Sequence, residues 1–76
     1  MKLTTVKVLD VFQINGYYYV KPENGSYEMI YRAAQGVYWD NDKYCLYFKG
    51  ITTRENALRF ITDAMKNEYG IALIFD

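Results

Sequence analysis

Few side chains in this 76-residue chain are suited to catalysis. The sequence contains no histidine, a single cysteine, Cys45, and a single serine, Ser26. Without histidine there is no imidazole to act as a general base or to activate a serine or cysteine nucleophile. Cys45 lies in an apolar segment, and no neighbour in sequence would lower the pKa of its thiol. We therefore expect no catalytic residue and no enzyme activity.

The residues that could bind a metal ion or a phosphate form no matching pattern either. Asp40, Asn41 and Asp42 are the best group of oxygen ligands, but a calcium loop needs another Asp or Asn two residues later, followed by glycine. Tyr44 and Cys45 occupy those positions. One thiol without histidine does not make a zinc site. The five glycines are scattered, so no phosphate-binding loop is expected. We predict neither a metal nor a cofactor.

The aromatic residues are the feature that points to binding. Nine of the residues are tyrosine, and aromatic residues make up 18% of the chain. Tyrosine and tryptophan are enriched in protein interfaces, where they bury a large area at low entropic cost. The candidate partner-binding residues are Tyr17, Tyr19, Tyr38, Trp39 and Tyr47, with the cations Lys43 and Lys49 at the margin.

The charge balance and the termini exclude several classes of protein. Nine basic residues are matched by nine acidic ones, whereas a protein that grips nucleic acid through its phosphates is expected to carry a basic excess. No apolar run reaches the roughly 18 residues of a membrane span, and no signal peptide is recognised. A lone thiol then favours a reducing cytoplasm. With no linker or repeat, residues 1–76 are expected to form a single domain.

The first half of the chain predicts hairpins. Residues 4–14 are rich in β-branched residues, but Asp10 interrupts their alternation, which indicates either a bulge or a strand buried on both faces. Asn15-Gly16 is a strong signal for a type I′ turn into a strand over residues 17–20. Residues 26–34 fit both strand alternation and helical spacing, and we favour a strand. Residues 37–39 and 44–49 are predicted to pair around the turn at residues 40–42.

The second half predicts a helix followed by a strand. Thr52 and Glu55 have the spacing of a capping box, a wide apolar stripe follows, and Gly70 is a suitable C-cap. Residues 71–75 are apolar on both faces, as in a central strand. The expected fold is α+β: a mostly antiparallel twisted sheet of five to six strands with one helix packed on a face, in the order β-β-β-β-β-α-β.

One helix is too narrow to cover both faces of such a sheet. Five or six strands span roughly 24–29 Å, while a helix is about 10 Å thick. Apolar residues nevertheless occur on both faces of several strands. Three interpretations of the second face follow: it exposes its tyrosines to a partner, its amphipathic tyrosines are half-exposed without a partner, or the sheet curls and buries that face on itself.

Part of the chain resembles a known DNA-binding family. The segment Gly36-Val37-Tyr38-Trp39-Asp40, the following hairpin, and a helix opened by Thr52-Thr53-Arg54-Glu55-Asn56-Ala57 and ended by Glu68-Tyr69-Gly70 resemble AP2 and phage-integrase arm-binding domains. Those domains back a three-stranded sheet with one helix and read DNA with the sheet. The resemblance implies sheet-based nucleic-acid binding, although the strands here carry Tyr, Asp and Cys in place of DNA-facing arginines.

Together these patterns predict a non-catalytic protein-interaction module. Small chains rich in tyrosine, asparagine and lysine are common among phage and mobile-element products, so the expected role is an inhibitor or adaptor of a host protein complex. The alternatives are a homodimeric domain that buries its own aromatic face and a sheet-based nucleic-acid-binding protein. A protein partner is favoured, a homo-oligomer is the next possibility, nucleic acid is disfavoured, and no membrane association is expected.

Overall fold

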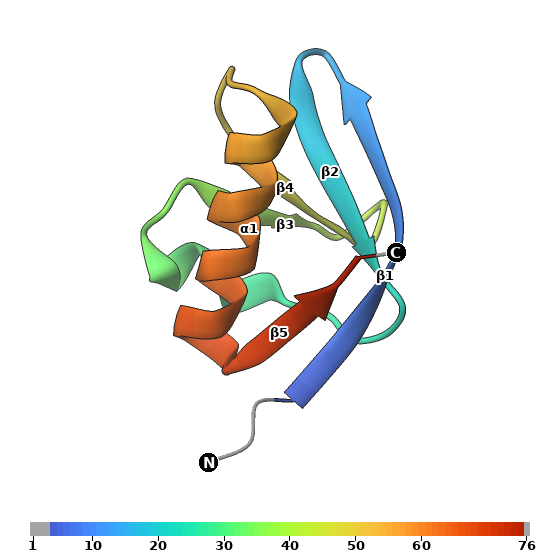
Figure 1. Ribbon diagram of the computed structural model, residues 1–76, viewed down its shortest axis with the longest axis vertical. Coiled ribbons are helices and arrows are strands. Elements are labelled where there is room, and N and C mark those ends of the chain that lie inside the picture. Colours follow the sequence, from blue (N-terminus) through green and yellow to red (C-terminus); the bar gives the residue numbers. More distant parts are fainter. Residues whose placement is uncertain (1–3, 76) are drawn as a thin grey trace.

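The computed structural model describes residues 4–75 and has the expected α+β class (Figure 1). One helix packs on a five-stranded mixed sheet. The elements in chain order are β1 (Thr4–Ile14), β2 (Tyr17–Pro22), the 3-10 helix η1 (Glu28–Ala33), β3 (Val37–Asp40), β4 (Cys45–Phe48), α1 (Arg54–Tyr69) and β5 (Ile71–Ile74).

The strands lie in the order β3-β4-β2-β1-β5. Strands β3, β4, β2 and β1 pair antiparallel with one another, as predicted. Strand β5 pairs parallel to β1 through residues 71–74. The prediction of a central strand over residues 71–75 is wrong, because β5 lies at the edge of the sheet. The β1–β2 hairpin already occupies one side of β1, so only the other side is available to a strand that follows α1 directly.

The β1–β2 hairpin has both local features that the sequence indicates. Asn15 and Gly16 have positive φ values of 52° and 87°, as a type I′ turn requires. Pairing passes from Val8 opposite Pro22 to Asp10 opposite Lys21, so Leu9 is the extra residue of a bulge. The bulge changes which alternate residues of β1 face α1.

Residues 26–34 do not form the favoured strand. They contain η1, in which Ile30 is fully buried while Met29 and Tyr31 are exposed. Tyr27 is also buried and its hydroxyl donates to the Asn24 carbonyl over 2.9 Å. The segment is helical because helical spacing places Tyr27 and Ile30 on the same side, in the core. In a strand, alternation would put these two residues on opposite faces.

Helix α1 begins one residue later than the predicted capping box implies. Thr53, not Thr52, is the N-cap, and its hydroxyl accepts from the Asn56 backbone N–H over 3.2 Å. The capping box of Thr52 and Glu55 is therefore wrong, and Thr52 accepts instead from the Asn56 side-chain amide. Gly70, at φ 66°, closes the helix as predicted.

The core lies on one side of the sheet. Helix α1 buries Ala57, Ile61, Ala64 and Met65 against the strands. The strand residues that meet them include Val20, Val37 and Leu46, all nearly inaccessible.

Within residues 4–75, no helix is long and apolar enough to cross a membrane.

Candidate functional site

Strand pairing aligns four aromatic side chains in one row across the sheet. Phe12 of β1 is opposite Tyr19 of β2, Tyr19 is opposite Tyr47 of β4, and Tyr47 is opposite Tyr38 of β3. Tyr17 stacks on the same row. Because directly paired residues point to the same face, these rings share the face of the sheet opposite α1. We call this surface the tyrosine face and define it as Phe12, Tyr17, Tyr19, Tyr38 and Tyr47.

The rings of the tyrosine face stack on one another. Phe12 and Tyr19 have centroids 5.4 Å apart at an interplanar angle of 7°. Tyr19 and Tyr47 are 5.1 Å apart at 22°, and Tyr38 lies 6.0 Å from Tyr47 at 36°. Tyr17 lies 6.5 Å from Tyr47 at 19°. Offset and parallel pairs of this kind contribute about 0.5–1.5 kcal/mol each beyond their buried area.

Stacking determines what this surface offers to solvent. Tyr19 is 8% exposed although it faces away from α1, because its neighbours cover it, whereas Tyr38 at the end of the row is 39% exposed. Tyr17 and Tyr47 are half-buried. Since the ring faces contact each other, the ring edges are left to meet a partner. The exposure of Tyr38 excludes the alternative that a curled sheet buries this face completely.

Two exposed lysines flank the row. The Lys43 ammonium is 5.9 Å from the Tyr19 centroid, and the Lys49 ammonium is 5.9 Å from that of Tyr38. Both distances are within the range of cation–π attraction. The Lys43 ammonium also lies 3.5 Å from an Asp40 carboxylate oxygen. These contacts hold positive charge beside the aromatic rings.

The turn that presents Lys43 is organised by Asp40. One carboxylate oxygen of Asp40 accepts from the backbone N–H groups of Asp42 and Lys43, each over 3.0 Å. The bond from the Lys43 N–H is the largest of the effects that lower the pKa of Asp40. The Asp-Asn-Asp segment is therefore a hydrogen-bonded turn, and among residues 4–75 no group of three acidic or thiol ligands could hold a metal ion.

Burial raises the pKa of two nearby acids. The pKa of Tyr47 is raised, mainly by burial and secondly by the charge of an ionised Tyr19. Burial likewise raises the pKa of the Cys45 thiol, which donates to the Lys43 carbonyl over 3.3 Å. A thiol with a raised pKa is a poor nucleophile. Tyr47 remains a neutral phenol at ordinary pH.

Trp39 is separated from the other predicted site residues. It pairs with Leu46 and packs against the core on the α1 side of the sheet. Its ring makes edge contacts with Tyr27 at 5.5 Å and Tyr44 at 6.3 Å. Its buried indole N–H has no hydrogen-bond partner in the described part of the chain. The structure thus brings together six of the seven predicted residues, and Trp39 supports the opposite face.

Phe12 completes the row and was absent from the predicted site. Strict alternation along β1 puts Phe12 on the same side as Val6 and Val8, which are buried in the core. The bulge at Leu9 reverses that assignment, so Phe12 turns to Tyr19. The interruption at Asp10 was the signal that could have found it.

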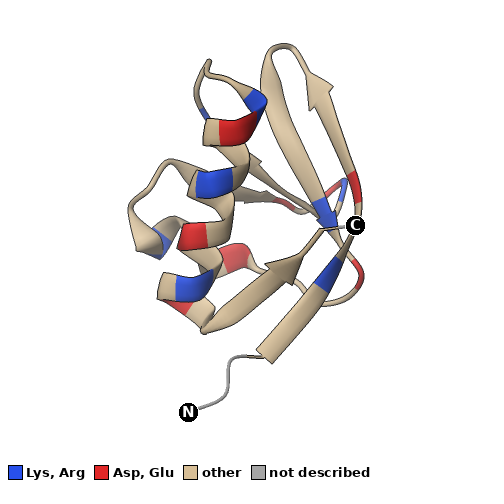
Figure 2. Cartoon of the chain, viewed as in Figure 1, with Lys and Arg blue, Asp and Glu red and all other residues tan. Residues whose placement is uncertain are grey.

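Charge is dispersed over the molecule. Figure 2 shows basic and acidic residues alternating along α1 and scattered over the strands, without a continuous basic stripe in the described chain. The surface therefore lacks the electrostatic footprint expected of a protein held by nucleic-acid phosphates.

Comparison with known proteins identifies the family. The family model for integron cassette protein Hfx_Cass5 matches residues 8–76. The chain belongs to this integron cassette protein family. Integron cassettes are mobile genetic elements, so the expected mobile-element class is confirmed at this coarse level. No curated protein and no solved structure is significantly similar to the chain.

Proposed function

We propose that this integron cassette protein is a non-catalytic protein-interaction module that binds a host protein through the tyrosine face. The observation that carries the proposal is the cross-strand row of Phe12, Tyr19, Tyr47 and Tyr38 on the face away from α1. In this role the protein inhibits or adapts a host protein complex. Its lack of histidine and the buried, protonated state of Cys45 support a role without catalysis.

The stacked rings favour binding because they are already ordered. A side chain that is free before binding loses about 0.5–1.5 kcal/mol of entropy when it is immobilised at an interface. The rings of Tyr19 and Tyr47 are held at 5.1 Å by each other and by their outer neighbours, so much of that cost is met during folding. A partner would meet ring edges in a preformed array, with ammonium groups at its border.

The same geometry favours a protein over single-stranded nucleic acid. Base stacking requires aromatic rings with a free face. In this row the faces of Tyr19 and Tyr47 are used against neighbouring rings, and Lys49 approaches the Tyr38 ring. The five-stranded sheet also differs from the three-stranded sheet of the AP2 and integrase arm-binding domains.

Site-specific photocrosslinking tests this proposal. A photoreactive phenylalanine analogue replaces Tyr38 in one protein and Tyr31 in a matched control. Both tyrosines are exposed, at 39% and 53%, but Tyr31 lies on η1, outside the tyrosine face. After irradiation in nuclease-treated bacterial lysate, a discrete adduct with a host protein is expected from position 38 and not from position 31.

The other outcomes are equally informative. An adduct only with a second copy of the chain would replace the proposal with a self-associating domain. An adduct that forms in untreated lysate but not in nuclease-treated lysate would indicate a nucleic-acid-dependent contact. Equal labelling from both positions would show that the tyrosine face has no special role.

A further inference from the structure

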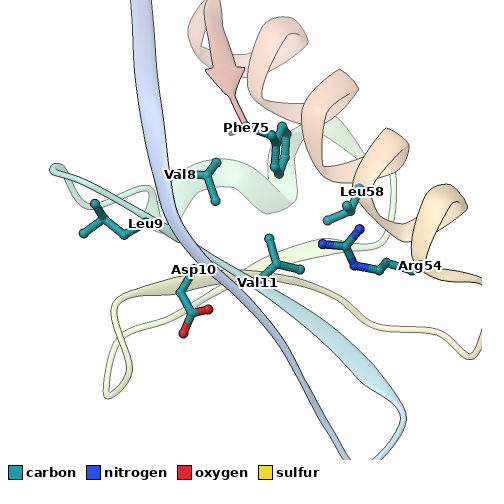
Figure 3. A pocket seen from close by; sticks show the side chains of 7 residues that line it. All are labelled: Val8, Leu9, Asp10, Val11, Arg54, Leu58 and Phe75. Carbon is teal, nitrogen blue, oxygen red and sulfur yellow. The ribbon is translucent and has the colours of Figure 1, made fainter.

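A separate cavity opens on the α1 side of the sheet, away from the tyrosine face. It has a volume of about 380 Å³ and lies where the bulge of β1, the first turns of α1 and the residue after β5 meet. Its lining residues are Val8, Leu9, Asp10, Val11, Arg54, Leu58 and Phe75 (Figure 3). This volume is within the range of small-molecule sites in proteins, about 300–1,000 Å³.

The cavity exists because β1 loses its neighbour part-way along its length. Strand β5 pairs with β1 only from Thr4 to Lys7 and ends at Ile74. From Val8 onward β1 pairs with β2 alone among the described strands, and the bulge at Leu9 changes its direction there. Space is therefore left between this edge of β1 and the start of α1.

Four apolar side chains face the cavity, beside the cation of Arg54. Figure 3 shows the side chains of Val8, Val11, Leu58 and Phe75 gathered around one space, while Leu9 and Asp10 point away on the other side of β1. Phe75 remains 37% exposed at the rim. An apolar group bound here would remove part of this aromatic surface from water, which is favourable.

One cation is available in the cavity. The guanidinium of Arg54 points toward Val11 (Figure 3), and no ion pair joins it to an acidic residue between positions 4 and 75. Arg54 is also the first residue of α1, where the helix dipole adds positive potential. A guanidinium binds a carboxylate through two parallel hydrogen bonds. Among the described lining residues Arg54 is the one cation, and the carboxylate of Asp10, the one acid, points away from the space (Figure 3), so one negative charge is matched and a phosphate dianion is not.

We propose that this cavity binds a small monocarboxylate with an apolar body. The carboxylate pairs with Arg54, and the body lies between Val11, Leu58 and Phe75. The site is independent of the tyrosine face, so either proposal stands if the other fails.

Two-dimensional ¹H–¹⁵N NMR titration of the full chain tests the site. The probes are 4-phenylbutyrate and its uncharged analogue 4-phenylbutyramide at millimolar concentration. We expect saturable shifts from the acid at the amides of residues 8–11, 54–58 and 75. Replacing the carboxylate by the amide removes a charge-assisted bond and should weaken binding by about tenfold or more.

Matched variants distinguish the Arg54 contact from general electrostatics. Arg54→Gln should bind the acid no better than the wild type binds the amide, and Arg54→Lys should recover part of the loss. Arg59→Gln removes the same charge from α1 outside the cavity and should change nothing. Each spectrum also reports whether the variant is folded. Non-saturable shifts, shifts centred on the tyrosine face, or equal binding by folded Arg54→Gln would each overturn the proposal.

Discussion

Replacing Tyr47 with alanine should cost clearly more stability than replacing Tyr38 at the exposed end of the row. Tyr47 is within stacking distance of three rings: Tyr19 at 5.1 Å, Tyr38 at 6.0 Å and Tyr17 at 6.5 Å. Each aromatic pair contributes about 0.5–1.5 kcal/mol. Taking the closest pair near the middle of that range and the others near its lower end, the stacking contributions sum to about 2 kcal/mol. Because the ring also loses its buried area, we expect the free energy of unfolding to fall by at least about 2 kcal/mol.

Two further alanine variants calibrate this value. Tyr38 stacks with Tyr47 alone among the described rings and also loses its contact with Lys49, so Tyr38→Ala should cost about 1 kcal/mol. Tyr31 is 53% exposed and belongs to no aromatic pair within residues 4–75, so Tyr31→Ala should stay within about 0.5 kcal/mol of wild type. The graded series follows the number of stacked neighbours, which side-chain size alone would not predict.

Urea unfolding followed by the fluorescence of Trp39 measures all three variants. Trp39 packs on the α1 side of the sheet, so its signal follows the core and not the substituted ring. An unchanged m-value would show that the surface exposed on unfolding is the same in each variant. A double-mutant cycle of Tyr19 and Tyr47 should give a coupling energy of about 1 kcal/mol. If Tyr47→Ala were no worse than Tyr31→Ala, or the coupling were zero, the stacked row would not be a structural unit.

Three other predictions concern the scaffold. Ala34 has a left-handed φ of 56°, so Ala34→Gly should raise stability by up to about 1 kcal/mol in urea unfolding, whereas Ala33→Gly should lower it. Thr53→Ala removes the true N-cap and should cost about 1 kcal/mol, measured in the same way, and a larger loss from Thr52→Ala would contradict that assignment. Burial raises the pKa of Cys45 above its usual 9.0, so the unfolded chain releases this proton first and stability should fall as the pH rises through 9.0. Urea unfolding at a series of pH values across that range measures the effect. The free energy of unfolding should decrease less with pH in Cys45→Ala than in the wild type, and the same decrease in both proteins would contradict the buried thiol.

Local signals in the sequence were sufficient to predict several elements of the fold. Asn15-Gly16 specifies a tight turn because both residues tolerate positive φ, and Gly70 ends α1 for the same reason. The apolar stripe of α1 fits only a helix. The absence of histidine removes imidazole chemistry in any fold. These features depend on neighbouring residues or on composition, so they need no knowledge of distant contacts.

Other features were decided by residues far apart in the chain. The segment at residues 26–34 fits two periodicities, and only packing of Ile30 beneath α1 and β3 selects the helical one. The edge position of β5 follows from which side of β1 was still unpaired. Local sequence does not contain that information, because strand order is a property of the whole sheet.

The candidate sites could be predicted in part from the sequence and depended in part on tertiary contacts. Alternation identified most tyrosines of the stacked row, but a bulge of one residue transferred Phe12 to that face, since strand side chains alternate with a period of two. The same bulge, together with the end of β5, opened the cavity beside Arg54. The sequence by itself determined which side chains were available and their local spacing. Only the tertiary structure decided which of them meet, because one inserted residue reverses the faces of a strand and pairing across the sheet sets the register.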